Sequence, residues 1–182
     1  AFRDSRLKHT GLTEYMTNIS NGCYANCSEL ENIEIPESII AIGDQAFCAC
    51  RNAKGTIKIP ANIQKIGNDA FANCDSITRF ELICDGNPEL YDYICYNDIS
   101  LTEIKISDHL TLPSRMFAYC SSLEEININN NLEDRVFFNC TGLKKVISGS
   151  KHFGQQAFSG CTNLETVILT NRELTFDTYV FD

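Results

Sequence analysis

The chain of 182 residues contains no tryptophan, two methionines, four prolines and three histidines. The histidines, His9, His109 and His152, lie at unrelated positions, and no recurring spacing pairs them with a serine, a cysteine or a carboxylate. No glycine-rich phosphate loop and no metal-ligand spacing occurs either. Because each class of catalytic centre needs such a constellation, the sequence predicts a protein that is not an enzyme and that uses neither cofactor nor metal.

Positive charge is also scarce, because 15 Lys and Arg residues stand against 24 Asp and Glu residues and the net charge is −9. No cluster of Lys or Arg provides the electrostatic footprint that nucleic acid or an anionic membrane surface requires. No apolar stretch approaches the roughly 20 residues needed to cross a bilayer. We therefore expect neither nucleic-acid binding nor membrane insertion.

The chain does contain a repeated unit, seen best in residues 39–50 (IIAIGDQAFCAC) and residues 63–74 (IQKIGNDAFANC). An aromatic residue anchors each unit, an apolar residue stands five positions before it, and a cysteine usually stands three positions after it. Three columns that stay in phase indicate a true repeat. Successive anchors are 20 to 24 residues apart, at Tyr24, Phe47, Phe71, Cys95 (a substitution), Phe117, Phe137, Phe158 and Phe181.

Each unit also carries a short alternating run, such as residues 104–106 (IKI), which is typical of a strand with one buried face. One short strand per unit can pair only with its equivalent in the next unit, so we expect a parallel stack in which neighbours bury one another's apolar columns. In the second unit the run is displaced by one residue, and Gly55 is the predicted insertion. Residues 16–182 should form about seven units, and residues 1–15 should be an N-terminal cap or a frayed tail.

The pattern L-x-x-I-x-I-P followed by I-G-x-x-A-F resembles the BspA-type leucine-rich repeats of bacterial and protist surface proteins. It is carried by residues 30–47 and 57–71, and the resemblance covers about residues 19–182. It implies an α/β repeat solenoid, a curved right-handed stack with one parallel sheet on the concave face and short turns, 3₁₀ or helical segments on the convex face. It also implies an extracellular or cell-surface location and a role in adhesion.

Six of the ten cysteines share the column after the anchor: Cys27, Cys50, Cys74, Cys120, Cys140 and Cys161. Stacked units place equivalent residues about 5 Å apart, which permits a disulfide, but a small core position also suits a free thiol. We expect buried thiols, with disulfides or metal binding as alternatives, and solvent contact for Cys48 and Cys84. Free thiols would also fit a cytoplasmic location, the alternative to the cell surface.

The fourth unit is irregular, because Cys95 replaces its aromatic anchor and Asp98 replaces its column cysteine. Three tyrosines, Tyr91, Tyr93 and Tyr96, surround the substitution. We expect a tyrosine ring to fill the space left by the missing anchor. The alternative is an aromatic bulge on the convex side that contacts a partner.

The outward strand positions are the candidate partner-binding residues. The inner of the two outward columns, Glu34, Lys58, Glu81 and Lys105, alternates in charge. We therefore expect ion pairs between neighbouring strands. Neighbouring outward isoleucines mark either a contact surface or a patch that the C-terminal segment covers. The candidates are Glu34, Lys58, Arg79, Glu81, Glu103, Lys105, Glu125, Asn127, Ile147 and Ile168.

We interpret the chain as a non-enzymatic protein-interaction or adhesion module of a secreted or cell-surface protein. Its concave sheet would bind a protein, such as a host or matrix protein, or a glycan. The alternative is a structural spacer or regulatory repeat region of a larger protein, with no ligand of its own. The sequence specifies no oligomeric state.

Overall fold

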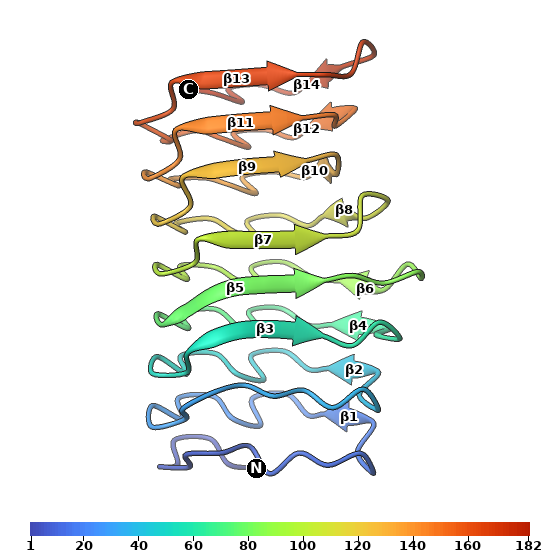
Figure 1. Ribbon diagram of the computed structural model, residues 1–182, viewed down its shortest axis with the longest axis vertical. Coiled ribbons are helices and arrows are strands. Elements are labelled where there is room, and N and C mark those ends of the chain that lie inside the picture. The colour runs from blue at the N-terminus through green and yellow to red at the C-terminus, as the bar shows by residue number, and fades with distance from the viewer.

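A computed structural model describes residues 1–182 as a parallel β-solenoid of about seven turns (Figure 1). In Figure 1 the chain runs from left to right in front, returns behind, and climbs from the N-terminus to the C-terminus, which is a right-handed winding. All strand pairs are parallel, as the repeat predicts. Each turn buries its apolar columns against the turns above and below, and together these residues form one continuous core.

Two rows of strands line the solenoid, which we call the long-strand face and the short-strand face. The long-strand face carries β3 (Gly55–Ile59), β5 (Ile77–Leu82), β7 (Glu103–Ile106), β9 (Glu125–Ile128), β11 (Lys145–Ser148) and β13 (Thr166–Leu169). The short-strand face carries β1 (Asn18–Ile19), β2 (Ala41–Ile42), β4 (Lys65–Ile66), β6 (Glu89–Leu90), β8 (Thr111–Leu112), β10 (Asn131–Leu132), β12 (His152–Phe153) and β14 (Thr175–Phe176). The long strands were predicted, except that the first unit's run, residues 33–35, forms none. The register between β3 and β5 shifts at Gly55, the predicted insertion.

The third side of each turn, which we call the turn edge, contains tight turns and no helix. In the second unit Gln45 and Ala49 have φ of 54° and 60°, in the left-handed region that interrupts a right-handed helix. The amide N–H of Ala46 closes a local turn, whereas that of Phe47 donates across to the carbonyl oxygen of Ala70 in the next unit (2.8 Å). Alternate amides therefore link neighbouring turns. The prediction of 3₁₀ or helical segments on the convex face is wrong.

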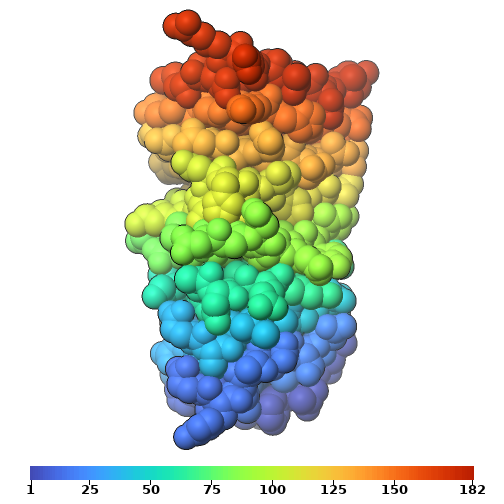
Figure 2. Space-filling view, turned by 90° about the vertical axis from the view of Figure 1, so that its right-hand side faces the viewer, coloured from blue at the N-terminus to red at the C-terminus, as the bar shows by residue number.

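The absence of helices also removes the reason for the expected curvature. Helices pack 8–10 Å apart whereas strands lie about 4.8 Å apart, so a stack with helices on one side must bend away from them. Here the turn edge repeats at the same spacing as the strands, because its amides pair across turns. Figures 1 and 2 show a stack without a marked bend, so we name its surfaces by their strands and not as concave or convex.

The anchor column forms a stack of rings along the core. Phe47 lies 5.1 Å from Tyr24 and 5.4 Å from Phe71 between ring centroids, with planes within 4° of parallel. Phe137 stacks in the same way between Phe117 and Phe158, at 5.6 and 5.3 Å. Parallel offset rings in register confirm the predicted column and contribute beyond the area that they bury.

In the fourth unit, which has no aromatic anchor, a phenylalanine from a strand fills the space in the ring stack. The ring of Phe80, which comes from strand β5, lies between Phe71 (6.1 Å) and Phe117 (6.0 Å) and is fully buried. The prediction that a tyrosine fills this space is therefore wrong. Phe80 occupies a position that is isoleucine in β7 and β9, so a larger side chain in one column compensates for Cys95 in another.

Both strand faces are interrupted between the fourth and fifth units, because β6 does not pair with β8 and β7 does not pair with β9. In other turns the residue after the short strand donates its amide N–H to the turn below, as Gly67 does to the Ile42 carbonyl oxygen (2.9 Å). Pro113 holds this position after β8 and has no N–H to donate. In Figure 2 the left outline is indented between the yellow-green level of β7 and the golden level of β9. The expected single sheet is therefore two three-stranded sheets.

The first residues of the chain continue the stack below the first complete unit. The Phe2 ring stacks on Tyr24 with centroids 5.5 Å apart, and the amide N–H of Phe2 donates to the Cys23 carbonyl oxygen (2.7 Å). Asp4 makes the equivalent bond to Ala25 (2.9 Å). These contacts support the proposal that residues 1–15 cap the apolar end of the solenoid.

All ten cysteines are free, and the six in the column after the anchor are buried. The thiol of Cys74 donates to the Phe47 carbonyl oxygen (3.3 Å), and the other five make the equivalent bond. The predicted buried thiols are confirmed. Cys84, expected to meet solvent, is only 4% exposed, whereas Cys23 and Cys48 are half-buried.

We expect Phe80→Ala to lower the free energy of unfolding by about 3–5 kcal/mol, as emptying a packed aromatic site does. Phe80→Ile should also destabilise, and adding Cys95→Phe should restore much of the loss, because the pair recreates the residue types of the other units. Urea denaturation of the four variants would measure this. Equal destabilisation by Cys95→Phe with and without Phe80→Ile would contradict the compensation.

We expect iodoacetamide, without denaturant, to modify Cys23 and Cys48 well before Cys74, Cys120 or Cys140. Burial raises the pKa of the Cys74, Cys120 and Cys140 thiols and raises the pKa of Cys50 to about 12, so these thiols are both shielded and protonated. Peptide mass spectrometry over time would measure the order. Early labelling of the column cysteines, or peptides linked by disulfides, would contradict it.

Candidate functional site

The candidate residues lie on the outward side of the long-strand face, as their alternation predicts. In β9, Glu125 and Asn127 are exposed while Ile126 and Ile128 are buried. The strands β3, β5, β7 and β11 also turn their candidates outward. Glu34 is exposed too, but it lies in the first unit, where no strand forms.

The charged residues of this face pair differently from the prediction. Lys58, Glu81 and Lys105 are partners in the backbone register of β3, β5 and β7, but they form no ion pairs with one another. Arg79 instead contacts both Glu81 (2.5 Å) and Glu103 (3.0 Å). Its guanidinium presents several donors in a fork, so it can engage a carboxylate on its own strand and one on the next.

The two lysines of the inner column turn to other carboxylates. Lys58 lies 3.5 Å from Glu37 in the loop before β2, and Lys105 lies 3.9 Å from Glu103. Both side chains are more than half exposed, so these pairs contribute little to stability. The expected ladder of alternating ion pairs is therefore wrong, and Arg79 is the centre of charge pairing on this half of the face.

The break between β7 and β9 divides the candidate residues into two groups. The sheet β3-β5-β7 carries Lys58, Arg79, Glu81, Glu103 and Lys105, and the sheet β9-β11-β13 carries Glu125, Asn127, Ile147 and Ile168. The structure brings together the members of each group. It does not make the two groups one uninterrupted surface.

The second group has an apolar centre. Ile147 and Ile168 are partners in the register of β11 and β13, and Asn127 is the partner of Ile147 in β9. Ile147 is half-buried and Ile168 is 44% exposed. Lys145 and Glu125, on the neighbouring outward column, form an ion pair of 2.8 Å.

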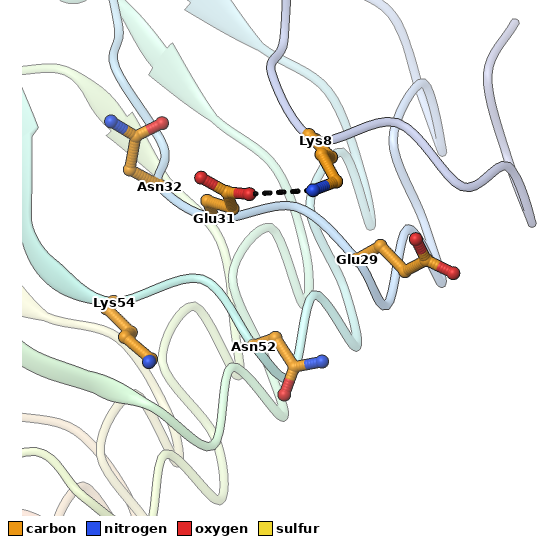
Figure 3. A pocket seen from close by; sticks show the side chains of 6 residues that line it. All are labelled: Lys8, Glu29, Glu31, Asn32, Asn52 and Lys54. Carbon is orange, nitrogen blue, oxygen red and sulfur yellow. Dashed lines mark ion pairs between the residues drawn. The ribbon is translucent and has the colours of Figure 1, made fainter.

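An open hollow of about 650 Å³ lies near the N-terminal end and is lined only by charged and amide residues (Figure 3). Lys8 and Glu31 form an ion pair of 3.4 Å across it. Binding pockets for small molecules are mostly apolar with a few polar groups, so this hollow does not have the character of a ligand site. Its walls are Lys8, Glu29, Glu31, Asn32, Asn52 and Lys54.

A second surface, on the turn edge, was only partly anticipated. Tyr93, Tyr96, Tyr119 and Phe138 form a row of edge-to-face rings with centroids 5.3 to 5.7 Å apart. Tyr91, the third tyrosine of the fourth unit, lies apart from this row beneath the ammonium of Lys65. The row bounds a hollow of about 330 Å³, and we call its lining the tyrosine–arginine patch: Tyr93, Tyr96, Arg115, Tyr119, Arg135, Phe138 and Gln156.

Of this patch, only Tyr93 and Tyr96 belong to the predicted aromatic bulge. A register signal exists for three of the others, because Arg115, Arg135 and Gln156 stand two residues before their anchors, as Tyr93 does. The column varies in residue type from unit to unit, so no periodic pattern marks it.

A cluster of titratable side chains is buried in the core at the fourth unit: Cys74, Cys95, Asp98 and Cys120. Burial raises the pKa of all four well above their ordinary values. A protonated, enclosed thiol is a poor nucleophile, and no group of three His, Cys, Asp or Glu side chains is arranged to hold a metal ion. We therefore assign the cluster to the core.

Among these four residues, Asp98 is the one whose burial lowers the stability of the fold. One carboxyl oxygen, Oδ1, accepts the amide N–H of Cys74 (2.7 Å), and the other, Oδ2, is buried without a partner. A buried carboxylate is strongly disfavoured against a neutral carboxyl, which explains the raised pKa. Asp98 therefore opposes folding wherever pH forces it to ionise.

We expect Asp98→Asn to gain stability over the parent as pH rises above about 4. Because the pKa of Asp98 is raised in the folded state, folding takes up a proton there, and stability falls with rising pH by at most ~1.4 kcal/mol per unit. The asparagine variant lacks this loss and keeps an acceptor at Oδ1. Thermal denaturation across pH would measure the difference, with the exposed Asp85→Asn as control; a difference independent of pH would contradict the assignment.

The family to which the sequence is similar has the repeat architecture that the structure shows. The chain matches the family model described as the BspA type leucine rich repeat region, in six copies over residues 1–111 and 88–182. A search of curated proteins found no significant match. None of the chain's segments forms a helix with the length and hydropathy required to cross a bilayer.

Solved structures share the architecture at low sequence identity. The T. pallidum leucine rich repeat protein has a TM-score of 0.72 and 21% identity, over 91% of this chain and 82% of that one. A leucine rich cell surface protein from Faecalibacterium prausnitzii has a TM-score of 0.56 and 19% identity; the match covers 87% of this chain and 59% of the F. prausnitzii chain. The family match spans the whole chain, and the fold agrees with it, so the chain belongs to the BspA-type leucine-rich repeat family.

Proposed function

We propose that the chain is a non-enzymatic interaction module of a secreted or cell-surface protein, and that it binds a protein partner through the long-strand face. Membership of a repeat family supports this, because stacked repeats offer broad surfaces for recognition. The F. prausnitzii structure is described as a cell surface protein, which supports the location. A glycan partner and a spacer without a ligand are the alternatives.

The observation that carries the proposal is the apolar pair Ile147 and Ile168 within an otherwise polar face. Protein interfaces combine an apolar centre with a charged and polar rim, and the ion pair of Lys145 and Glu125 beside Asn127 provides such a rim. A flat sheet surface with these side chains suits a protein surface better than a small molecule, for which it has no enclosing walls.

The charged half of the face has a different role in the proposal. Lys58 and Lys105 are exposed, and their ion pairs with Glu37 and Glu103 are weak, so they are free to meet carboxylates on a partner. Such rim charges govern the association rate and its salt dependence more than the final affinity. Glu34, Glu81 and Arg79 complete this flank of the proposed contact surface.

We expect Ile147→Thr with Ile168→Thr to weaken partner binding about tenfold or more while the protein stays folded, because threonine keeps strand propensity but removes apolar contact. The matched control is Ile99→Thr, since Ile99 has the same 44% exposure as Ile168 and lies off the long-strand face. Immobilised parent and variants would capture proteins from host-cell and matrix extracts, with quantitative mass spectrometry. Circular dichroism would verify the fold.

Three outcomes would contradict the proposal. If the parent retains no protein above background, the spacer alternative replaces it. If the parent binds only a glycan on an array, the partner class is wrong. If Ile99→Thr loses the same proteins as the double variant, or neither loses any, the long-strand face is not the contact surface.

A further inference from the structure

Three positions of the turn edge vary in residue type from unit to unit: two residues before the anchor, and one and two residues after it. In the fourth, fifth and sixth units these positions carry the large members of the tyrosine–arginine patch. In the second and third units the same positions carry Gln45, Cys48, Ala49, Asp69, Ala72 and Asn73. The patch is therefore a local feature and not a property of the repeat.

The backbone of these positions gives no reason for large side chains. Tyr93, Arg115, Tyr119 and Arg135 have φ of 61°, 55°, 65° and 58°. Asparagine, aspartate and glycine accept this left-handed region most readily, and bulky residues there are uncommon. Asp69 and Asn139 show that aspartate and asparagine serve the fold at the sites equivalent to Arg115 and Tyr119, so the turn does not explain the arginines and tyrosines.

The charge of the patch is opposite to that of the molecule. Four of the seven arginines pair with carboxylates, namely Arg3, Arg6, Arg51 and Arg79, whereas Arg115 and Arg135 do not. No Asp or Glu lines the hollow, although the chain has 24. The amide of Arg115 bonds to the carbonyl oxygen of Asp134, next to Arg135, so two uncompensated cations occupy neighbouring turns.

The hydrogen bonds of the two guanidiniums leave donors free. Arg115 lies over the ring of Tyr93, 5.3 Å from its centroid, and donates one bond to the Tyr93 hydroxyl (2.8 Å). Arg135 donates through Nε to Gln156 (2.7 Å), and its two terminal nitrogens have no partner in the protein. Arginine is held in position in this way when planar recognition of a carboxylate is required.

We propose that the tyrosine–arginine patch is a binding site for an acidic peptide segment of a partner protein. A carboxylate of the peptide lies between Arg115 and Arg135, and a neighbouring apolar or aromatic side chain packs against Tyr96, Tyr119 and Phe138. Tyrosine and arginine are the residue types that concentrate binding energy in protein interfaces. The net charge of −9 disfavours long polyanions, so a short acidic segment fits better than nucleic acid or a sulfated polysaccharide.

This site lies on the turn edge, apart from the long-strand face, and does not depend on the function proposed for that face. The test uses the whole chain and a capped hexapeptide of alternating aspartate and phenylalanine, measured by calorimetry at about 0.15 M salt, where exposed charges are moderately screened. A hexapeptide with asparagine in place of aspartate and free glucuronate are the comparison ligands. We expect the acidic hexapeptide to bind and the other two to bind at least about tenfold more weakly.

Two variants localise the binding. Arg115→Gln with Arg135→Gln removes both charges, and Tyr119→Asn removes one ring; glutamine and asparagine already occupy these columns at Gln156 and Asn139, so both variants should fold. Each variant should bind the acidic peptide with an affinity about tenfold or more below that of the parent. The controls are Arg172→Gln, an arginine without a carboxylate partner elsewhere, and the double isoleucine variant of the long-strand face; both should bind as the parent does.

Failure of the parent to bind the acidic hexapeptide at millimolar concentration would overturn the proposal. Preference for glucuronate would replace the peptide with an anionic sugar, and equal binding of the asparagine peptide would remove the role of the arginines. An unchanged affinity in the arginine variant would place the peptide elsewhere. None of these outcomes bears on the long-strand face, whose own test uses different substitutions.

Discussion

The architecture depends on the amide hydrogen bonds that cross from turn to turn along the turn edge. Left-handed residues on either side of each anchor, such as Gln45 and Ala49, point alternate N–H groups at the next unit. This pairing sets the same spacing on the turn edge as on the two strand faces, so no helix forms and the stack stays straight. It also keeps the anchor positions of successive units in register, which allows the rings and the column thiols to stack.

The parts of the fold that the sequence predicts are those that repeat in residue type. The anchor and cysteine columns and the alternation of the long strands follow from periods that each unit shares, and all three are confirmed. The short strands of two residues are too brief to show alternation. The break after the fourth unit was readable in principle, since Pro113 stands where the other turns donate an amide, but it appears once and so lies outside any periodic pattern. The role of Phe80 was not predicted, because this side chain belongs to the strand column and fills a space in the anchor column.

The candidate site shows the same division. Which side chains face outward follows from the strand period, and that part was predictable. Which charges meet was not, because the reach of Arg79 to Glu81 and Glu103 depends on side-chain length and not on register. Most of the tyrosine–arginine patch was missed for a related reason, since its members come from four different units at positions where each unit has its own residue type.

The interruption between the fourth and fifth units affects the two strand faces but not the turn edge, where Cys95, Asn97 and Tyr93 still donate to the fifth unit. Backbone hydrogen bonds thus join the two halves of the solenoid along the turn edge but not along the strands of the two faces. A bend of the stack at this junction would break no strand–strand hydrogen bonds, whereas a bend between other turns would. The row from Tyr96 to Tyr119 crosses the same junction on the side that remains hydrogen-bonded.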